Sequence, residues 1–153
     1  MKNMKQGLGQ ALLGWCLVGA CALAHATESV PVPVRQEGSV PMTLFAPTRV
    51  EAHLAKTAGL VVVQLTSFET TCSFCIRGNP TYDALAKDSA TEAQFIRVIY
   101  RPWTGVGQDP FAKALGVGGL PVFLTYQDGK LLRRHDGIGT QAELQKDLLD
   151  GLN

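Results

Sequence analysis

Residues 70–80 read TTCSFCIRGNP and hold two cysteines, Cys72 and Cys75, with two residues between them. A proline, Pro80, follows the second cysteine by five positions. Such a pair can be a redox-active dithiol, half of a zinc site, or a plain structural disulfide. The rest of the chain has to decide between these three interpretations.

The first 26 residues have the order of charged, apolar and small residues that is typical of a secretory signal. Lys2 and Lys5 give a positive start, an uncharged apolar run covers 8–23, and residues 24–26 (AHA) match the small-x-small pattern before a cleavage site. A retained membrane anchor is the alternative, but the run is short for a span of roughly 20 residues. We therefore expect residues 1–26 to be a removed signal peptide and the protein to be periplasmic, with no membrane span after processing.

A second processing route would use Cys21. Residues 17–21 (LVGAC) resemble a bacterial lipobox, in which Cys21 would be lipidated and become the new N-terminus. We favour cleavage after Ala26, because the small-x-small pattern lies where the polar region begins. A lipid anchor at Cys21 is the minor alternative.

Cleavage after Ala26 leaves 127 of the 153 residues, a length typical of one domain. The loss of Lys2 and Lys5 lowers Lys+Arg from 14 to 12 against 13 Asp+Glu, so the net charge falls from +1 to −1. Nucleic-acid binding depends on neutralising phosphates with basic side chains. This charge balance therefore indicates no nucleic-acid partner.

The number of cysteines argues against zinc. Cys16 and Cys21 leave with the signal, so only the pair in CSFC remains, in a compartment where disulfides persist. A structural zinc site needs four ligands, usually from two such pairs. The other candidates, His53 and His135, are single residues in no ligand spacing. We therefore expect no metal and no cofactor.

The remaining sequence predicts an α/β domain over 48–153, preceded by an extended Pro- and Val-rich segment over 27–47. The first expected elements are an edge strand near 42–45, a helix from a Thr48–Glu51 capping box to about 57, a buried strand over 59–67 and a helix over 81–87. A strand over 94–100, a helix opened by Asp109-Pro110 and a hairpin around Asp128-Gly129 follow. The closing helix comes after a Thr140–Glu143 capping box, with Leu144, Leu148 and Leu152 as its buried stripe. A right-handed crossover makes the strands over 59–67 and 94–100 parallel, and the hairpin adds antiparallel strands. We predict a mixed central β-sheet flanked by helices on both faces.

The cysteine pair lies where the central strand gives way to a helix. The helix dipole and the unpaired N–H groups at a helix start favour a thiolate on Cys72, whereas Cys75 lies one turn further in and is more buried. Cys72 would then attack a disulfide or be attacked in one, and Cys75 would resolve the mixed disulfide. A structural disulfide has no need of this location, and closing so short a loop removes little unfolded-state entropy.

Residues 48–153 also resemble the thioredoxin superfamily. The resemblance is carried by the strand LVVVQL, the CSFC motif, the helix proline Pro80 and the segment GVGGLPVFLTYQDGK over 116–130. It implies a thioredoxin-like fold in which Pro121 is a cis-proline that faces the cysteines. It also implies that the backbone of Leu120 pairs with an extended client peptide, a form of strand addition.

Three departures from the family pattern bear on activity. Thr71 stands where the family has a Trp before the first cysteine. Gln64 is the nearest equivalent of the family's buried acid, and Phe68-Glu69 resemble a two-residue insertion before the motif. Ser73-Phe74 is neither the Gly-Pro of reductases nor the Pro-His of strong oxidases. Glutamine cannot shuttle a proton as a carboxylate can, which argues against efficient reduction of the thioredoxin type. The Ser73-Phe74 pair leaves the direction of electron flow open.

Some further residues have two interpretations each. Trp103 follows a strand end on the side where the cysteines are expected, so it is either a substrate contact or a cap on the core. Arg77 could hold a thiolate, but we expect a solvated helix charge. Pro80 should bend its helix, and Gly118 and Gly119 should serve backbone geometry.

The first hypothesis is an exported thiol–disulfide oxidoreductase that uses Cys72 and Cys75 to exchange disulfides with protein clients and with a redox partner protein. Reductase, oxidase and isomerase activity are all open. The alternative is a thioredoxin-fold accessory module of an envelope assembly, with an idle or structural disulfide. We expect a monomer, since the sequence shows no extra N-terminal domain of the kind with which dimeric isomerases pair.

Overall fold

The computed structural model of the protein describes residues 42–152. The expected signal peptide, Cys21 and most of the Pro- and Val-rich segment lie outside the described residues. Within them, no helix has the length and apolar character needed to cross a membrane.

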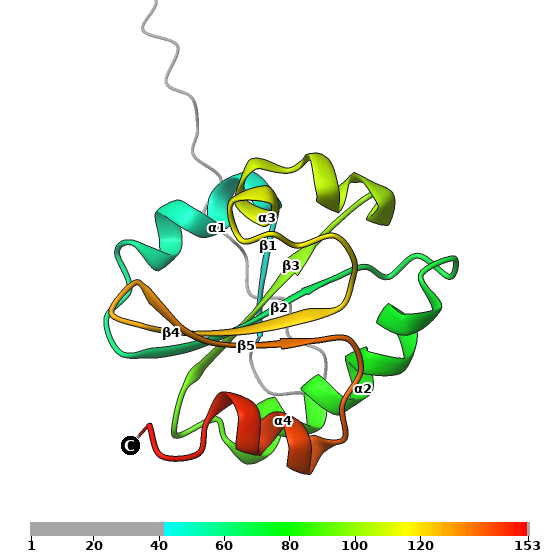
Figure 1. The fold of residues 1–153 in the computed structure, drawn as a ribbon. Helices are drawn as coiled ribbons and strands as arrows, with labels where there is room; N and C mark the ends of the chain where they lie inside the picture. Colours follow the sequence, from blue (N-terminus) through cyan, green and yellow to red (C-terminus); the bar gives the residue numbers. More distant parts are fainter. Residues whose placement is uncertain (1–41, 153) are drawn as a thin grey trace, which may run out of the picture.

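The described chain forms one sheet with helices packed against it (Figure 1). Its elements, in chain order, are β1 (Thr43–Phe45), α1 (Pro47–Leu54), β2 (Leu60–Thr66), α2 (Ser73–Asp88), β3 (Gln94–Ile99), the 3-10 helix η1 (Trp103–Gln108), α3 (Pro110–Ala114), β4 (Val122–Gln127), β5 (Lys130–Asp136) and α4 (Gln141–Leu148). The strand order is β1-β3-β2-β4-β5. β1 and β2 run parallel to β3, whereas β4 runs antiparallel to β2 and to β5. The predicted mixed sheet, with its parallel pair and its late hairpin, is confirmed.

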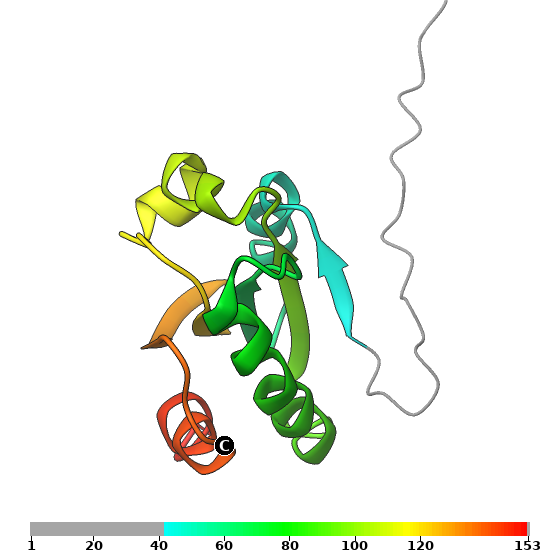
Figure 2. The same cartoon turned by 90° about the vertical axis from the view of Figure 1, so that its right-hand side faces the viewer.

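The central strand β2 separates two apolar cores. Because side chains alternate along a strand, Val61, Val63 and Leu65 pack on one face with α1 and α3. Val62 packs on the other face with α2 and α4, beside Tyr82. Figure 2 shows the two helix layers on opposite sides of the sheet. The unbroken β-branched run in β2 therefore has its predicted meaning of a strand covered on both faces.

The start of the domain differs from the expectation. The capping box at Thr48–Glu51 is wrong: α1 begins at Pro47, and its N-cap Ala46 makes no side-chain hydrogen bond. Proline suits the first helical position, because its fixed φ is already helical and its missing N–H is not needed there. Thr48 is therefore inside the first turn. The edge strand expected near 42–45 is confirmed as β1, and because it pairs with β3, the sheet begins before the expected domain start at residue 48.

The helix caps and the hairpin turn predicted in the second half of the chain are confirmed. Asp109 caps α3 by accepting the Ala112 N–H at 3.0 Å, and Thr140 and Glu143 form the predicted capping box of α4. Asp128 and Gly129 both have positive φ, at 51° and 77°, in the predicted hairpin turn. The closing helix ends earlier than expected, at Leu148, so Leu152 lies beyond it. The predicted helix start at the cysteine pair is confirmed, since α2 begins at Ser73 with Cys72 as its N-cap. The segment 81–87 is the later part of this helix, which runs through Pro80 without a break.

Candidate redox site

The two cysteines form a disulfide across the first turn of α2. Cys72 is the N-cap of the helix and Cys75 lies within its first turn. Their sulfur atoms are 1.95 Å apart and their Cα atoms 5.3 Å apart. Cys75 is fully buried, and Cys72 is only 4% exposed. The two cysteines therefore differ less in exposure than expected. They differ in position, since Cys72 is the N-cap and Cys75 lies inside the first turn.

The helix start offers unpaired N–H groups to a negative charge at Cys72. The Cys72 carbonyl accepts the Ile76 N–H at 3.1 Å, which is the first helical bond of α2. The N–H groups of residues 73–75 therefore precede the hydrogen-bond ladder. The N-cap makes no side-chain hydrogen bond, and no acidic residue stands in the first turn. Together with the helix dipole, these features favour a thiolate on the first cysteine.

Trp103 lies against the loop that precedes Cys72. Its backbone N–H donates to the Glu69 carboxylate at 2.9 Å, and its indole Nε1–H donates to the Thr71 hydroxyl at 3.1 Å. The ring packs, partly buried, on the core cluster that contains both cysteines. Trp103 therefore caps the core, and its contact with substrate stays a prediction. Thr71, which stands where the resemblance would place a Trp, is thus bound by the Trp at the start of η1.

The sequence alone missed the roles of Glu69 and Thr71. Trp103 is 34 and 32 positions away from them, so no local pattern brings these residues together. The signal that could have raised the question is the two-residue insertion that contains Glu69, since it lengthens the loop on the side of Trp103.

The loop proline packs against the cysteine helix. The Leu120–Pro121 bond is cis, as the resemblance implied, and a second cis bond, Arg101–Pro102, precedes Trp103. Gly78 on α2 is so close to Pro121 that a Cβ on this glycine would lie 3.1 Å from the proline Cγ. Pro121 thus contacts the helix about one turn beyond the cysteine pair, and the Leu120 side chain is buried with the cysteines in the same core cluster.

Replacing Gly78 by Leu should lower the free energy of unfolding by about 1–3 kcal/mol, because a larger side chain overpacks a filled site. The atoms that it meets belong to Pro121, Ile138 and Phe123. Urea unfolding measures the change. The control is Arg77→Leu at the neighbouring exposed position, which should stay within about 0.5 kcal/mol of the wild type. Equal stability of the two variants would contradict the close packing of the proline loop on α2.

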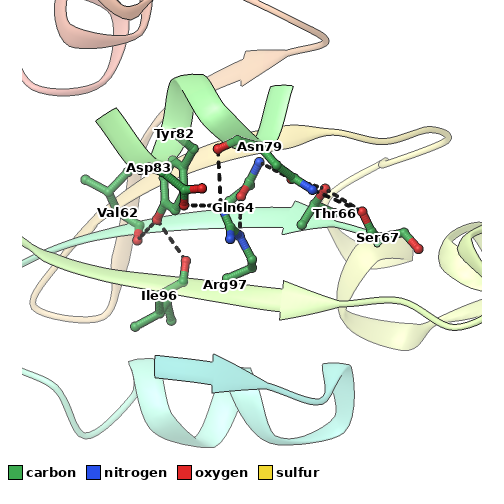
Figure 3. Close-up of polar contacts among 9 residues, drawn as sticks. All are labelled: Val62, Gln64, Thr66, Ser67, Asn79, Tyr82, Asp83, Ile96 and Arg97. Atoms are coloured by element: carbon green, nitrogen blue, oxygen red, sulfur yellow. Dashed lines mark hydrogen bonds and ion pairs between the residues drawn. The ribbon is translucent and has the colours of Figure 1, made fainter. Parts of the chain in front are cut away.

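A network of buried polar side chains lies between α2 and the sheet, next to the turn of α2 that follows the cysteine pair (Figure 3). The side-chain oxygen of Asn79 accepts the Gln64 Nε2–H at 3.0 Å and the Thr66 hydroxyl at 2.8 Å. The Asn79 amide donates to the Ser67 carbonyl at 3.3 Å. Asn79 therefore joins the cysteine helix to the last residues of β2, from which the loop to Cys72 departs.

Arg97 of β3 completes this network. It stands opposite Gln64 in the parallel register, and its Nε–H donates to the Gln64 side-chain oxygen at 2.5 Å. Its Nη2 donates to the Asn79 backbone carbonyl at 3.4 Å and to the Asp83 carboxylate at 2.9 Å. Gln64 therefore lies on the central strand, as predicted, and its buried side-chain amide binds the guanidinium of Arg97.

Tyr82 closes the network from the same helix. Its hydroxyl lies 2.7 Å from the Val62 carbonyl oxygen and 2.8 Å from that of Ile96. Burial raises the pKa of this phenol above its usual value. The side chain therefore stays a neutral bridge between β2, β3 and α2.

The remaining candidates lie elsewhere or play smaller parts. Arg77, expected as a solvated charge, is exposed, with its guanidinium 4.9 Å from the centre of the exposed Phe74 ring. The His53 ring packs 4.5 Å from Phe45, and His135 pairs with Asp147 at 2.7 Å. Among residues 42–152, no three His, Cys, Asp or Glu residues gather closely enough to hold a metal ion.

Comparison with known proteins adds evidence on the fold. No protein-family model matches the sequence, and no curated protein sequence matches it. Among solved structures, the X-ray structure of Fasciola hepatica thioredoxin is similar, with a TM-score of 0.51 and 23% sequence identity. The match covers 66% of this chain and 89% of that one. Together with the sheet topology, this likeness confirms the predicted thioredoxin-like fold.

Proposed function

We propose that this chain, whose fold is thioredoxin-like, is a thiol–disulfide oxidoreductase that acts on protein clients through Cys72 and Cys75. The observation that carries the proposal is the disulfide across the first turn of α2, with Cys72 at the N-cap and Cys75 fully buried. At such a position a thiolate is stabilised by the helix, which gives the outer cysteine the role of nucleophile.

The exchange has two steps in either direction. In the oxidising direction, a client thiolate attacks the Cys72 sulfur, the Cys72–Cys75 bond breaks, and Cys75 leaves as a thiolate that takes up a proton. A second client thiolate then attacks the client sulfur of the mixed disulfide, and Cys72 leaves as a thiolate. In the reducing direction, Cys72 attacks a client disulfide and Cys75 displaces the reduced client. Two electrons move in each case, and a redox partner protein resets the pair.

The proposal also includes export, which is supported by the pattern of residues 1–26. In the periplasm, clients with paired cysteines would be available and disulfides would persist. We propose that the mature protein works there as a monomer. The proposed peptide contacts are the backbone of Leu120, the neighbouring Pro121, and Trp103.

The alternative function is that of an accessory module that binds a partner and keeps its disulfide closed. Two observations favour it: the 4% exposure of Cys72, and the exposed Phe74 and Ile76 that flank the buried Cys75 on α2. Covalent capture of clients separates the two functions. A variant without Cys75 should accumulate mixed disulfides if the chain is an oxidoreductase, and should accumulate none if it is only a binding module.

A further inference from the structure

We propose that the buried network of Gln64, Asn79 and Arg97 biases the cysteine pair towards oxidising client thiols. This inference rests on the proposed function and concerns the direction of electron flow. In the favoured direction, a client dithiol loses two electrons and forms a disulfide, while the Cys72–Cys75 bond breaks and the pair becomes a dithiol. A disulfide of the glutathione class, or of a partner protein, then restores the pair.

The network is next to the motif on the same helix. Asn79 lies four residues after Cys75, and both side chains are buried on the same side of α2. Residues at this spacing are neighbours, with about 5–6 Å between their Cβ atoms. The Arg97 Nη2 donates to the Asn79 carbonyl and to the Asp83 carboxylate, so the guanidinium is bound to the part of α2 that lies one to two turns beyond the inner cysteine.

The buried guanidinium of Arg97 has one carboxylate partner, and that partner is largely exposed. The residue is 5% exposed, and two of its hydrogen-bond acceptors, in Gln64 and Asn79, are neutral. Its carboxylate partner, Asp83, has a side chain that is 55% exposed, so water screens that charge. Among residues 42–152, no Asp or Glu is buried. The rings of Phe68 and Tyr82 lie 5.5 and 5.4 Å from the guanidinium, and they keep water from it.

A buried positive charge stabilises the reduced pair more than the oxidised one. Reduction creates thiols that ionise, and a nearby cation in a low-dielectric core lowers the free energy of a thiolate. The disulfide carries no charge and gains nothing from the cation. Since a couple becomes a stronger oxidant when its reduced form is stabilised, the network and the start of α2 act in the same direction.

The test measures the equilibrium between the protein and glutathione. The wild-type pair should be reduced by an excess of reduced glutathione. Gln64→Glu places a buried carboxylate of nearly the same shape within hydrogen-bond distance of Arg97, in addition to the exposed carboxylate of Asp83. The equilibrium constant for reduction of this variant by glutathione should be about tenfold lower than that of the wild type, which equals a fall of about 30 mV in reduction potential.

Gln145→Glu is the matched control. The same substitution then falls on α4, where the Gln145 side chain accepts a hydrogen bond from Ser89 beyond the C-terminal end of α2. This variant should keep the wild-type equilibrium. Arg97→Met should shift the equilibrium in the same direction as Gln64→Glu, because it removes the cation itself. A role in stability alone would change the unfolding of both redox forms and leave the potential unchanged.

The outcomes separate this inference from the proposed function. A wild-type pair that stays oxidised in excess glutathione, yet is reduced by dithiothreitol in the folded state, overturns the inference and leaves the oxidoreductase intact. The inference also fails if Gln64→Glu and Gln145→Glu have the same potential. A pair that dithiothreitol cannot reduce in the folded protein overturns the proposed function as well. If neither network variant folds, the wild-type equilibrium alone decides.

Discussion

A Cys75→Ser variant should accumulate covalent complexes with client proteins, and a Cys72→Ser variant should accumulate few or none. The reason is the division of labour across the first turn of α2. In the proposed mechanism, Cys72 at the N-cap forms the mixed disulfide, and the neighbouring thiol of Cys75 releases it. We expect the first variant to capture at least about ten times more client than the second, since the helix start favours the thiolate of Cys72.

Non-reducing electrophoresis and mass spectrometry of the trapped complexes measure this difference in cells that export the protein. The double variant, without either cysteine, is the control for complexes that do not depend on the motif. Capture through Cys75 in the Cys72→Ser variant would reverse the assigned roles. Equal amounts of complex in the double variant would remove the evidence for exchange.

Asn79→Ala should lower the free energy of unfolding by about 3 kcal/mol or more, because each buried polar group left without a partner costs about 1–3 kcal/mol. The substitution removes the shared acceptor of Gln64 and Thr66 and the donor to the Ser67 carbonyl. It also loosens the connection between the end of β2 and the cysteine helix. Urea unfolding of the oxidised protein measures the loss.

Lys87→Ala provides the comparison on the same helix. Lys87 is exposed near the C-terminal end of α2, so its truncation should stay within about 0.5 kcal/mol of the wild type. An Asn79→Ala variant that is no less stable than Lys87→Ala would mean that the buried amide does not join the strand to the helix.

Local patterns predicted most of the fold. The unbroken run in β2 identified the central strand, the Asp128-Gly129 turn identified the hairpin, and Thr140–Glu143 identified the last helix. Each of these signals lies within a few neighbouring residues, so it can be recognised without knowledge of the tertiary contacts. The capping box at Thr48 failed for a local reason too, because Pro47 offered a better first position.

The candidate site was predictable only in part. The spacing of the cysteines and their place at a helix start identified the pair. The contact between Gln64 and Arg97 joins residues 33 positions apart, and it depends on the register of two parallel strands. A polar residue inside each of two apolar strands was the available hint. Which residues they would face on α2 required the packing of the helix on the sheet.

The proposed direction of exchange also depends on that packing. From the sequence, Gln64 indicated only the lack of a carboxylate on the central strand. In the structure it accepts a hydrogen bond from a buried guanidinium next to the cysteine helix. The balance of charge around the pair is therefore a property of three elements together, β2, β3 and α2.

Counting the thiols of the folded protein in a dithiothreitol titration, with the fold monitored by circular dichroism, tests the redox role of the cysteine pair most directly. Cys72 and Cys75 should become reduced together, in one two-electron transition that reverses when the reductant is removed, while the fold is kept. A pair that stays oxidised until the protein unfolds would contradict this role.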